Sequence, residues 1–204
     1  MTQWLSLPVI WLIAVIPLVS PDTTHQDNYD YFEVDTSRSE IHWNCHHIGT
    51  VKISNGTLVF NDEELVHAEI LADMNSIKNQ DIESDLLQGT LENVLKSVEF
   101  FQTDNFPEAK FKLHSVNELE NSKYEIIGDL IIFDFGVCTH FEANITYTPD
   151  SVYVKTNSII LDRTNWGIYY LSRRNLFPAE GEEGFVVPDT VKIDAYLQAS
   201  RKKK

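Results

Sequence analysis

Residues 66–73 read VHAEILAD, and this stretch decides the fold. Its apolar side chains recur at every second position from Val66 to Ala72, opposite the polar residues His67, Glu69 and Asp73. Successive side chains of a β-strand point to opposite faces, so a period of two is typical of a strand with one buried and one solvated face. The stretch therefore predicts a strand at the surface of an apolar core.

The same alternation recurs on both sides of this stretch. Period-two patterns occupy about residues 41–45, 51–60, 109–113, 124–132, 141–147, 152–160 and 191–197. Asn55-Gly56 is a turn or bulge signal, and Thr148-Pro149-Asp150 is a turn. About eight short strands separated by polar turns predict an all-β fold, a sandwich or an antiparallel β-barrel.

One segment has a helical pattern instead. Its apolar residues recur at spacings of three, four and five: Ile82, Leu86, Leu87, Leu91, Val94, Leu95 and Val98. Acidic residues crowd its start, where the helix dipole favours negative charge. We expect one amphipathic helix from Asp81 to about Leu95, packed on the barrel, with Gly89 costing it roughly 1 kcal/mol relative to Ala.

Composition limits the classes of function. The chain has 204 residues, of which 43% are hydrophobic, enough for one domain with a packed core. Its formal net charge of −15 argues against nucleic acid as a partner. The basic run at 201–204 is expected to be a solvated tail.

The N-terminus predicts export. Residues from Trp4 to Val19 are uncharged and mostly apolar, so 1–20 is expected to be a secretion signal, 21–28 a polar linker and 29–200 the barrel domain. Pro8 and Pro17 interrupt the run, which is short for a membrane span. The predicted location is periplasmic or secreted. Because no Lys or Arg precedes the run, an uncleaved N-terminal membrane anchor is the alternative.

Residue types that commonly act in catalysis or bind metals form no recognisable catalytic or metal-binding motif in the sequence. Cys45-His46-His47 contains metal-ligand types, but neighbours on a strand point to opposite faces, so no metal site is expected there. The acidic loop Glu180, Glu182 and Glu183 lacks the spacing of a calcium loop. Cys45 and Cys138 are expected to be small buried residues, with one disulfide as the alternative. We expect no cofactor and no catalytic residues.

Several stretches, taken in order, resemble the YceI-like family of lipid- or polyisoprenoid-binding, lipocalin-like barrels. The opening pattern comprises Asp35, Ser39, Ile41, Trp43, His46 or His47, and Gly49. Further matches are Met74 to Ile77, LKSVEFF at 95–101, FPEAKF at 106–111, YEIIGDL at 124–130, DRTNWGI at 162–168 and the closing strand at 191–199. Together they cover about residues 30–199.

Two departures affect the rim of such a barrel. The family's Lys-Pro turn after the YEIIGDL strand is replaced by residues 131–140, IIFDFGVCTH, which leaves the rim geometry there undetermined. The family's Arg-Asp pair before the helix is also missing, since Glu83 to Leu86 stands in its place, so no headgroup contact is transferred from that Arg.

The resemblance implies a barrel whose pore binds a long apolar ligand: a polyisoprenoid, a quinone-like molecule or another lipid. The residues it places at the pore or its mouth are Trp43, Phe100, Phe101, Phe111 and Trp166, while Phe106-Pro107 shapes a turn. The aromatic residues alone leave a filled core open as well. The alternatives are therefore an envelope structural or interaction barrel and, third, an enzyme acting on a lipid or a small stress metabolite. A homodimer is also left open.

Overall fold

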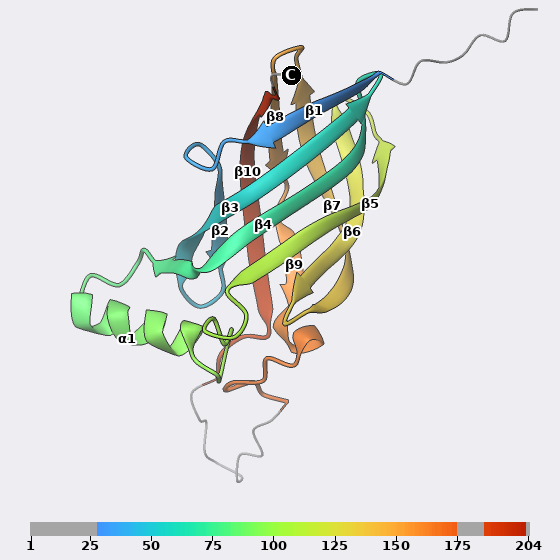
Figure 1. Ribbon diagram of the computed structural model, residues 1–204. Coiled ribbons are helices and arrows are strands. Elements are labelled where there is room, and N and C mark those ends of the chain that lie inside the picture. The colour runs from blue at the N-terminus through green and yellow to red at the C-terminus, as the bar shows by residue number, and fades with distance from the viewer. Residues whose placement is uncertain (1–27, 175–185, 203–204) are drawn as a thin grey trace, which may run out of the picture.

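The computed structural model describes residues 28–174 and 186–202, which form an all-β molecule with one α-helix (Figure 1). The predicted leader, nearly all of the linker, the acidic loop residues Glu180, Glu182 and Glu183, and residues 203–204 lie outside this description. Ten strands are formed by the described residues: β1 (Tyr29–Val34), β2 (Glu40–Asn44), β3 (Ile48–Asn61), β4 (Glu64–Asn79), β5 (Glu108–Glu118), β6 (Lys123–Ile132), β7 (Phe135–Tyr147), β8 (Ser151–Thr156), β9 (Ile159–Asp162) and β10 (Thr190–Arg201).

These ten strands close into an antiparallel ring with eight positions. Strands β1 and β2 share one position, because each pairs with both β3 and β10. Strands β8 and β9 share another, because both pair with β10. The pairing of Leu197 with Val154 is part of the β8–β10 ladder that closes the ring. The predicted fold, an antiparallel barrel of about eight strands, is confirmed: the alternation left a sandwich or a barrel open, and the family resemblance implied the barrel.

Bulges keep the apolar residues of the long strands on the inner face of the barrel although the alternation changes phase. In β3 the register shifts between Ile53 and Asn55, which makes Ser54 the extra residue of a bulge, and Asn55-Gly56 continues the paired strand directly after it instead of forming a hairpin turn. A bulge inserts one residue and increases local twist, which helps a sheet to curve into a barrel. The bulge therefore lets β3 and β4 remain paired along most of their length.

Aromatic rings close one end of the barrel. Phe32, Phe60 and Tyr147 pack together with ring-centroid distances of 5.0 to 5.7 Å. The Tyr147 hydroxyl donates to Asp30 Oδ2 at 2.6 Å, and the guanidinium of Arg201 pairs with the same carboxylate. Strand β10 thus extends through Arg201, one residue beyond the predicted domain boundary, because this ion pair fixes a side chain that was expected in a solvated tail.

The helix α1 (Asp85–Lys96) lies at the opposite end of the barrel (Figure 1). It begins four residues later than predicted, because Asp81 belongs to a turn that precedes it. Asn79 Oδ1 accepts from the backbone N–H of Ile82, and Asn79 Nδ2 donates to Asp81. Leu95 is buried against the barrel. No helix among the described residues combines the length and apolar character needed to cross a bilayer.

Candidate apolar ligand pore

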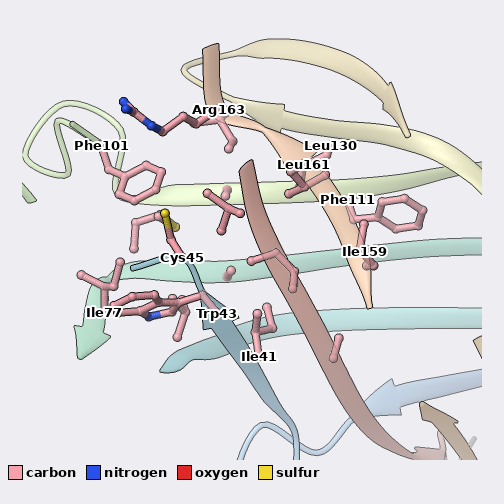
Figure 2. Close-up of a pocket in the computed structure, with 18 of the residues that line it drawn as sticks. Ile41, Trp43, Cys45, Ile77, Phe101, Phe111, Leu130, Ile159, Leu161 and Arg163 are labelled. Atoms are coloured by element: carbon pink, nitrogen blue, oxygen red, sulfur yellow. The ribbon is translucent and has the colours of Figure 1, made fainter. Parts of the chain in front are cut away.

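The interior of the barrel contains an apolar cavity of about 730 Å³ (Figure 2). Its inner end is lined by Leu58 and Ala143, close to the aromatic cluster of Phe32, Phe60 and Tyr147. Its outer end is lined by His46, Leu87 and Thr90, all exposed, so the mouth lies between the loop 45–47 and α1. The cavity has the size of small-molecule sites in proteins.

Alanine at inward positions leaves the space open. The wall includes Ala68, Ala72, Ala109, Ala143 and Ala195, contributed by four strands. Ala72 and Ala109 face each other as partners in the β4–β5 ladder. An eight-stranded barrel is just wide enough to be filled by large side chains, so methyl groups at these positions keep the centre empty. In the sequence, Ala68 and Ala72 on the apolar face of one strand are the signal that indicates this space.

The two predicted tryptophans lie in the wall near the mouth. The Trp43 ring lies over Gly49, where a Cβ atom would come within 2.4 Å of the ring. Trp166 lies in a short 3₁₀ helix, η1 (Arg163–Trp166), and its indole nitrogen donates to the carbonyl oxygen of Leu130 at 3.2 Å. Both rings are therefore fixed before any ligand enters.

The three predicted phenylalanines line the same cavity at different depths. Phe100 and Phe101 follow α1 and pack edge to face at 5.0 Å. Phe111 lies farther inside, over Gly128 and 5.5 Å from the ring of Phe141. Figure 2 shows Phe101 at one end of the lining and Phe111 at the other. The structure thus brings all five predicted residues to one cavity, while their contact with a ligand stays a prediction.

Arg163 is the charged residue of the cavity wall, and the sequence analysis did not single it out. Only 3% of it is exposed, and its guanidinium donates to the carbonyl oxygens of Ile168, Val187 and Pro188 at 2.8 to 3.0 Å. Burial lowers its pKa, and the nearby Asp189 carboxylate opposes that shift. With these bonds Arg163 joins η1 to the segment before β10 and supports the rim.

The residues Cys45, His46 and His47 form a bend between β2 and β3, not the strand assumed from the sequence. All three line the mouth, yet they do not gather into a group of three metal ligands in the described chain. The Cys45 thiol donates to the carbonyl oxygen of Pro188 at 3.5 Å, and burial raises its pKa. His47 instead pairs with Asp81 at 3.2 Å.

The cysteines form no bond with each other. Cys45 is half-buried, but Cys138 is exposed on the outer wall, so the expectation of two buried residues is wrong for Cys138. Cys138 occupies an outward-facing position of β7, which the sequence pattern alone did not distinguish from an inward one.

The rim turn that departs from the family pattern is a two-residue hairpin between β6 and β7. Phe133 and Asp134 both have positive φ, 56° and 58°, as a type I′ turn requires. The Phe133 ring packs against Phe106 at 5.3 Å, and the carbonyl oxygen of Pro107 accepts from the N–H of Met74 at 2.8 Å. Phe106-Pro107, which was expected to shape a turn, directly follows the turn at 103–105 and supports the rim through these contacts.

The comparisons with known proteins agree with this architecture. The family model described as the YceI-like domain matches residues 32–199. Burkholderia cenocepacia BcnA has a similar structure, with 16% identity, a TM-score of 0.63, and coverage of 81% of this chain and 98% of BcnA. A polyisoprenoid binding domain from Saccharophagus degradans, implicated in plant cell wall breakdown, has 14% identity, a TM-score of 0.58, and coverage of 87% and 100%.

A third similar structure is the Campylobacter jejuni YceI protein, at 15% identity and a TM-score of 0.52, with coverage of 79% of this chain and 85% of that one. No curated protein matches the chain in sequence. At these identities the structural likeness shows the fold, and the family assignment depends on the match over residues 32–199.

Proposed function

Because this chain belongs to the YceI-like family, we propose that its barrel binds one slender apolar molecule, of the polyisoprenoid or quinone-like class, as a carrier or sequestering protein. The observation that supports the proposal is the apolar cavity running from the loop 45–47 and α1 towards Leu58 and Ala143. An apolar space that extends from the mouth into the barrel interior can accommodate a chain-like apolar molecule.

The size of the cavity sets the scale of the ligand. If an apolar carbon occupies about the volume of a water molecule in the liquid, roughly 30 Å³, a space of about 730 Å³ holds on the order of 25 carbons. Each CH₂ group transferred from water contributes about 0.8 kcal/mol. A fraction of such a chain therefore provides useful affinity without any polar contact.

The aromatic rings suit this role. Trp43, Phe100, Phe101, Phe111 and Trp166 are held by neighbouring rings, by glycines or by a hydrogen bond, so they lose little freedom when a ligand enters. The polyisoprenoid-binding description of the Saccharophagus degradans domain supports the same ligand class.

A binding role is proposed in preference to catalysis. The guanidinium of Arg163 is occupied by three backbone carbonyl oxygens, and the Cys45 thiol, whose pKa is raised by burial, donates to the carbonyl oxygen of Pro188. Catalysis on a lipid would need a convergent acid, base or nucleophile at the apolar wall. The polar residues described there fit structural roles instead.

The proposed function is tested by filling the pore. Ala109→Phe places a ring opposite Ala72 inside the cavity, whereas Lys112→Phe adds the same ring on the outer face of the same strand. Delipidated protein is titrated with geranylgeraniol, and binding is followed by intrinsic tryptophan fluorescence. We expect affinity at least tenfold weaker in Ala109→Phe and unchanged in Lys112→Phe. Equal binding by all three proteins would contradict a ligand in the pore.

We further propose that the protein works outside the cytoplasm, on the basis of the uncharged apolar segment from Trp4 to Val19. Cell fractionation tests this point: the expected location is the periplasm or medium, or the membrane fraction if the segment remains as an anchor. Full-length protein in the soluble cytoplasmic fraction would argue against it.

A further inference from the structure

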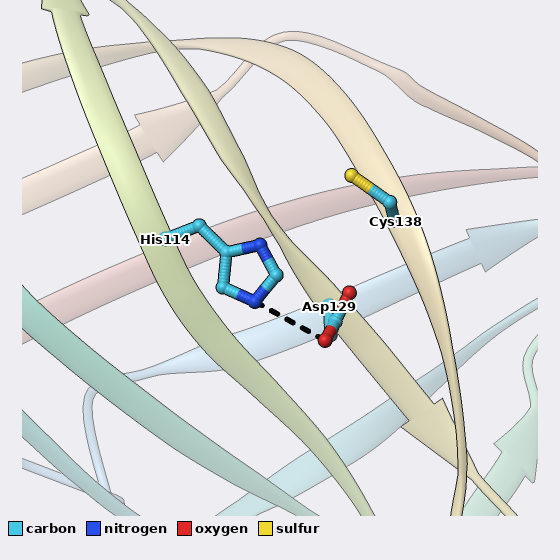
Figure 3. Close-up of side chains that lie close together, drawn as sticks. All are labelled: His114, Asp129 and Cys138. Carbon is cyan, nitrogen blue, oxygen red and sulfur yellow. Dashed lines mark ion pairs between the residues drawn. The ribbon is translucent and has the colours of Figure 1, made fainter.

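Three potential metal ligands lie together on the outer wall of the barrel. His114, Asp129 and Cys138 come from the neighbouring strands β5, β6 and β7, and their ligand atoms all lie within 4.8 Å of one another (Figure 3). His114 Nε2 is 3.1 Å from Asp129 Oδ2. Asp129 and Cys138 are direct partners in the β6–β7 ladder. The register of three strands therefore creates this cluster.

A bulge directs the histidine to the cluster. The β5–β6 register shifts between Leu113 and Ser115, which leaves His114 without a partner of its own in the ladder. Leu113 is buried and lines the cavity, so the next side chain, His114, turns outward. Bulges commonly re-aim a side chain at a specific site.

A fourth potential ligand lies beside the cysteine. His140 is two residues beyond Cys138 on β7, on the same outward face, and its Nε2 atom is 3.6 Å from Cys138 Sγ. The cluster thus offers two imidazoles, one thiol and one carboxylate. This is a donor set that zinc-type ions accept in tetrahedral sites.

We propose that His114, Asp129, Cys138 and His140 bind a divalent zinc-type ion on the outer wall of the barrel. Ligand atoms around tetrahedral zinc lie about 3.3 to 3.6 Å apart, given metal–ligand distances of about 2.0 to 2.3 Å. His114, Asp129 and Cys138 need to contract by up to about 1.5 Å to reach that spacing, and His140 lies near the cluster only through Cys138, so it must turn further towards the ion. Side-chain rotation supplies these movements because His114 and Cys138 are exposed. The net charge of −15 also attracts cations.

The charge of the ion matches that of the ligands. On binding, the Cys138 thiol loses its proton to solvent, and the thiolate and the Asp129 carboxylate together neutralise the two positive charges of the ion. The bound ion links β5, β6 and β7, so it stabilises the folded chain in proportion to the free metal concentration. The site is separate from the pore, because Leu113 and Thr139, adjacent to its ligands, point inward.

Cobalt(II) titration of the reduced, chelator-treated full chain tests the proposal, since a cobalt–thiolate bond gives a near-ultraviolet charge-transfer band and a tetrahedral site gives intense visible bands. We expect both bands to saturate at one equivalent and zinc to displace cobalt. Cys138→Ser should abolish the charge-transfer band, while Cys45→Ser, at the pore mouth, should leave it unchanged. His114→Ala, Asp129→Asn and His140→Ala should each weaken binding at least tenfold.

The opposite results overturn the site. These are the absence of a charge-transfer band in the wild type, a band that survives Cys138→Ser, or undiminished affinity in any of the other three variants. Circular dichroism of each variant establishes that it is folded. A thermal melt adds a second readout: zinc should raise the midpoint of the wild type and not that of Cys138→Ser. Ligand binding in the pore should be equal in both, so the two proposals fail independently.

Discussion

Phe111 and Phe60 are the same residue type in different surroundings. Phe60 is 1% exposed and packs against Phe32 and Tyr147 at the closed end of the barrel. The Phe111 ring contacts Phe141 on one side but borders the cavity on another. A side chain that borders empty space makes fewer van der Waals contacts than one in a packed core. Truncating it therefore lowers the free energy of unfolding less.

This difference predicts separate effects of truncation. Phe60→Ala should lower the free energy of unfolding by about 3–5 kcal/mol, as for a deletion in a packed core. Phe111→Ala should cost less than about 3 kcal/mol and should weaken retention of an apolar ligand. Chemical denaturation and ligand titration of both variants measure this. Equal losses of stability, with no effect on ligand retention, would mean that Phe111 is part of a filled core.

At this scale the sequence could predict which residues face inward, but not whether their side chains meet. Period-two patterns placed Phe111 and Ala109 on one face. Whether rings fill the centre depends on which residues oppose each other across the strands, and the pairing of Ala72 with Ala109 is a matter of register. The cluster of His114, Asp129 and Cys138 depends on register and on a bulge, and a linear pattern contains neither.

Among the elements, helix α1 contains a residue of low helix propensity in its interior. Gly89 lies in its middle, and a Cβ atom added there would meet nothing within 4 Å. Gly89→Ala should therefore stabilise the helix by about 0.5–1 kcal/mol and slow amide hydrogen exchange in Asp85–Lys96 roughly two- to fivefold. Gly49→Ala is the contrasting variant, because its Cβ would lie 1.9 Å from a backbone oxygen, and it should destabilise the barrel. Unchanged exchange in Gly89→Ala would show that backbone entropy does not limit the helix.

The 3₁₀ helix η1 depends on the ionisation of its capping residue. Asp162 accepts from the backbone N–H and hydroxyl of Thr164 at 3.0 and 2.6 Å and also pairs with Arg174. The hydrogen bond from the Thr164 hydroxyl is the main reason that the pKa of Asp162 is lowered, although desolvation opposes it. A lowered folded-state pKa means stabilisation that is present above the ordinary carboxyl pKa and is lost as the pH falls through the folded value.

Asp162→Ala should therefore cost about 1 kcal/mol at neutral pH, a typical effect of removing a helix cap. The difference between wild type and variant should shrink as the pH falls below the ordinary value of 3.8. Urea denaturation over a range of pH measures it. A difference that stays constant into the acid range would exclude the ionised carboxylate as its source.

Element boundaries were the part of the fold that the sequence predicted least well. The acidic residues before α1 suggested that the helix starts at Asp81, but the amide of Asn79 forms a turn that competes with the first helical bonds. The sequence also did not indicate that two strands can occupy one position of the ring. That β1 and β2 occupy one position of the ring follows from two separate pairings with β3 and β10, and alternation within each strand says nothing about its partner.

For the whole molecule, the closed barrel and its open interior together support the binding of an apolar ligand in the pore. The ring removes sheet edges, the aromatic cluster closes one end, and inward alanines keep the middle open. The all-β class and the approximate number of strands followed from the sequence because alternation and turns are local properties, whereas the barrel was implied by the family resemblance. The volume of the interior is a property of all eight positions at once, and only the three-dimensional structure provides it.

Native mass spectrometry of the full chain, purified from its host without delipidation and transferred from a mild detergent, tests the central claim most directly. The account predicts a major species heavier than the protein by one apolar molecule of on the order of 25 carbons, released by gentle activation and absent from Ala109→Phe. A wild-type chain that carries no such molecule, and that takes up none when incubated with a series of prenyl alcohols and quinones, would contradict it.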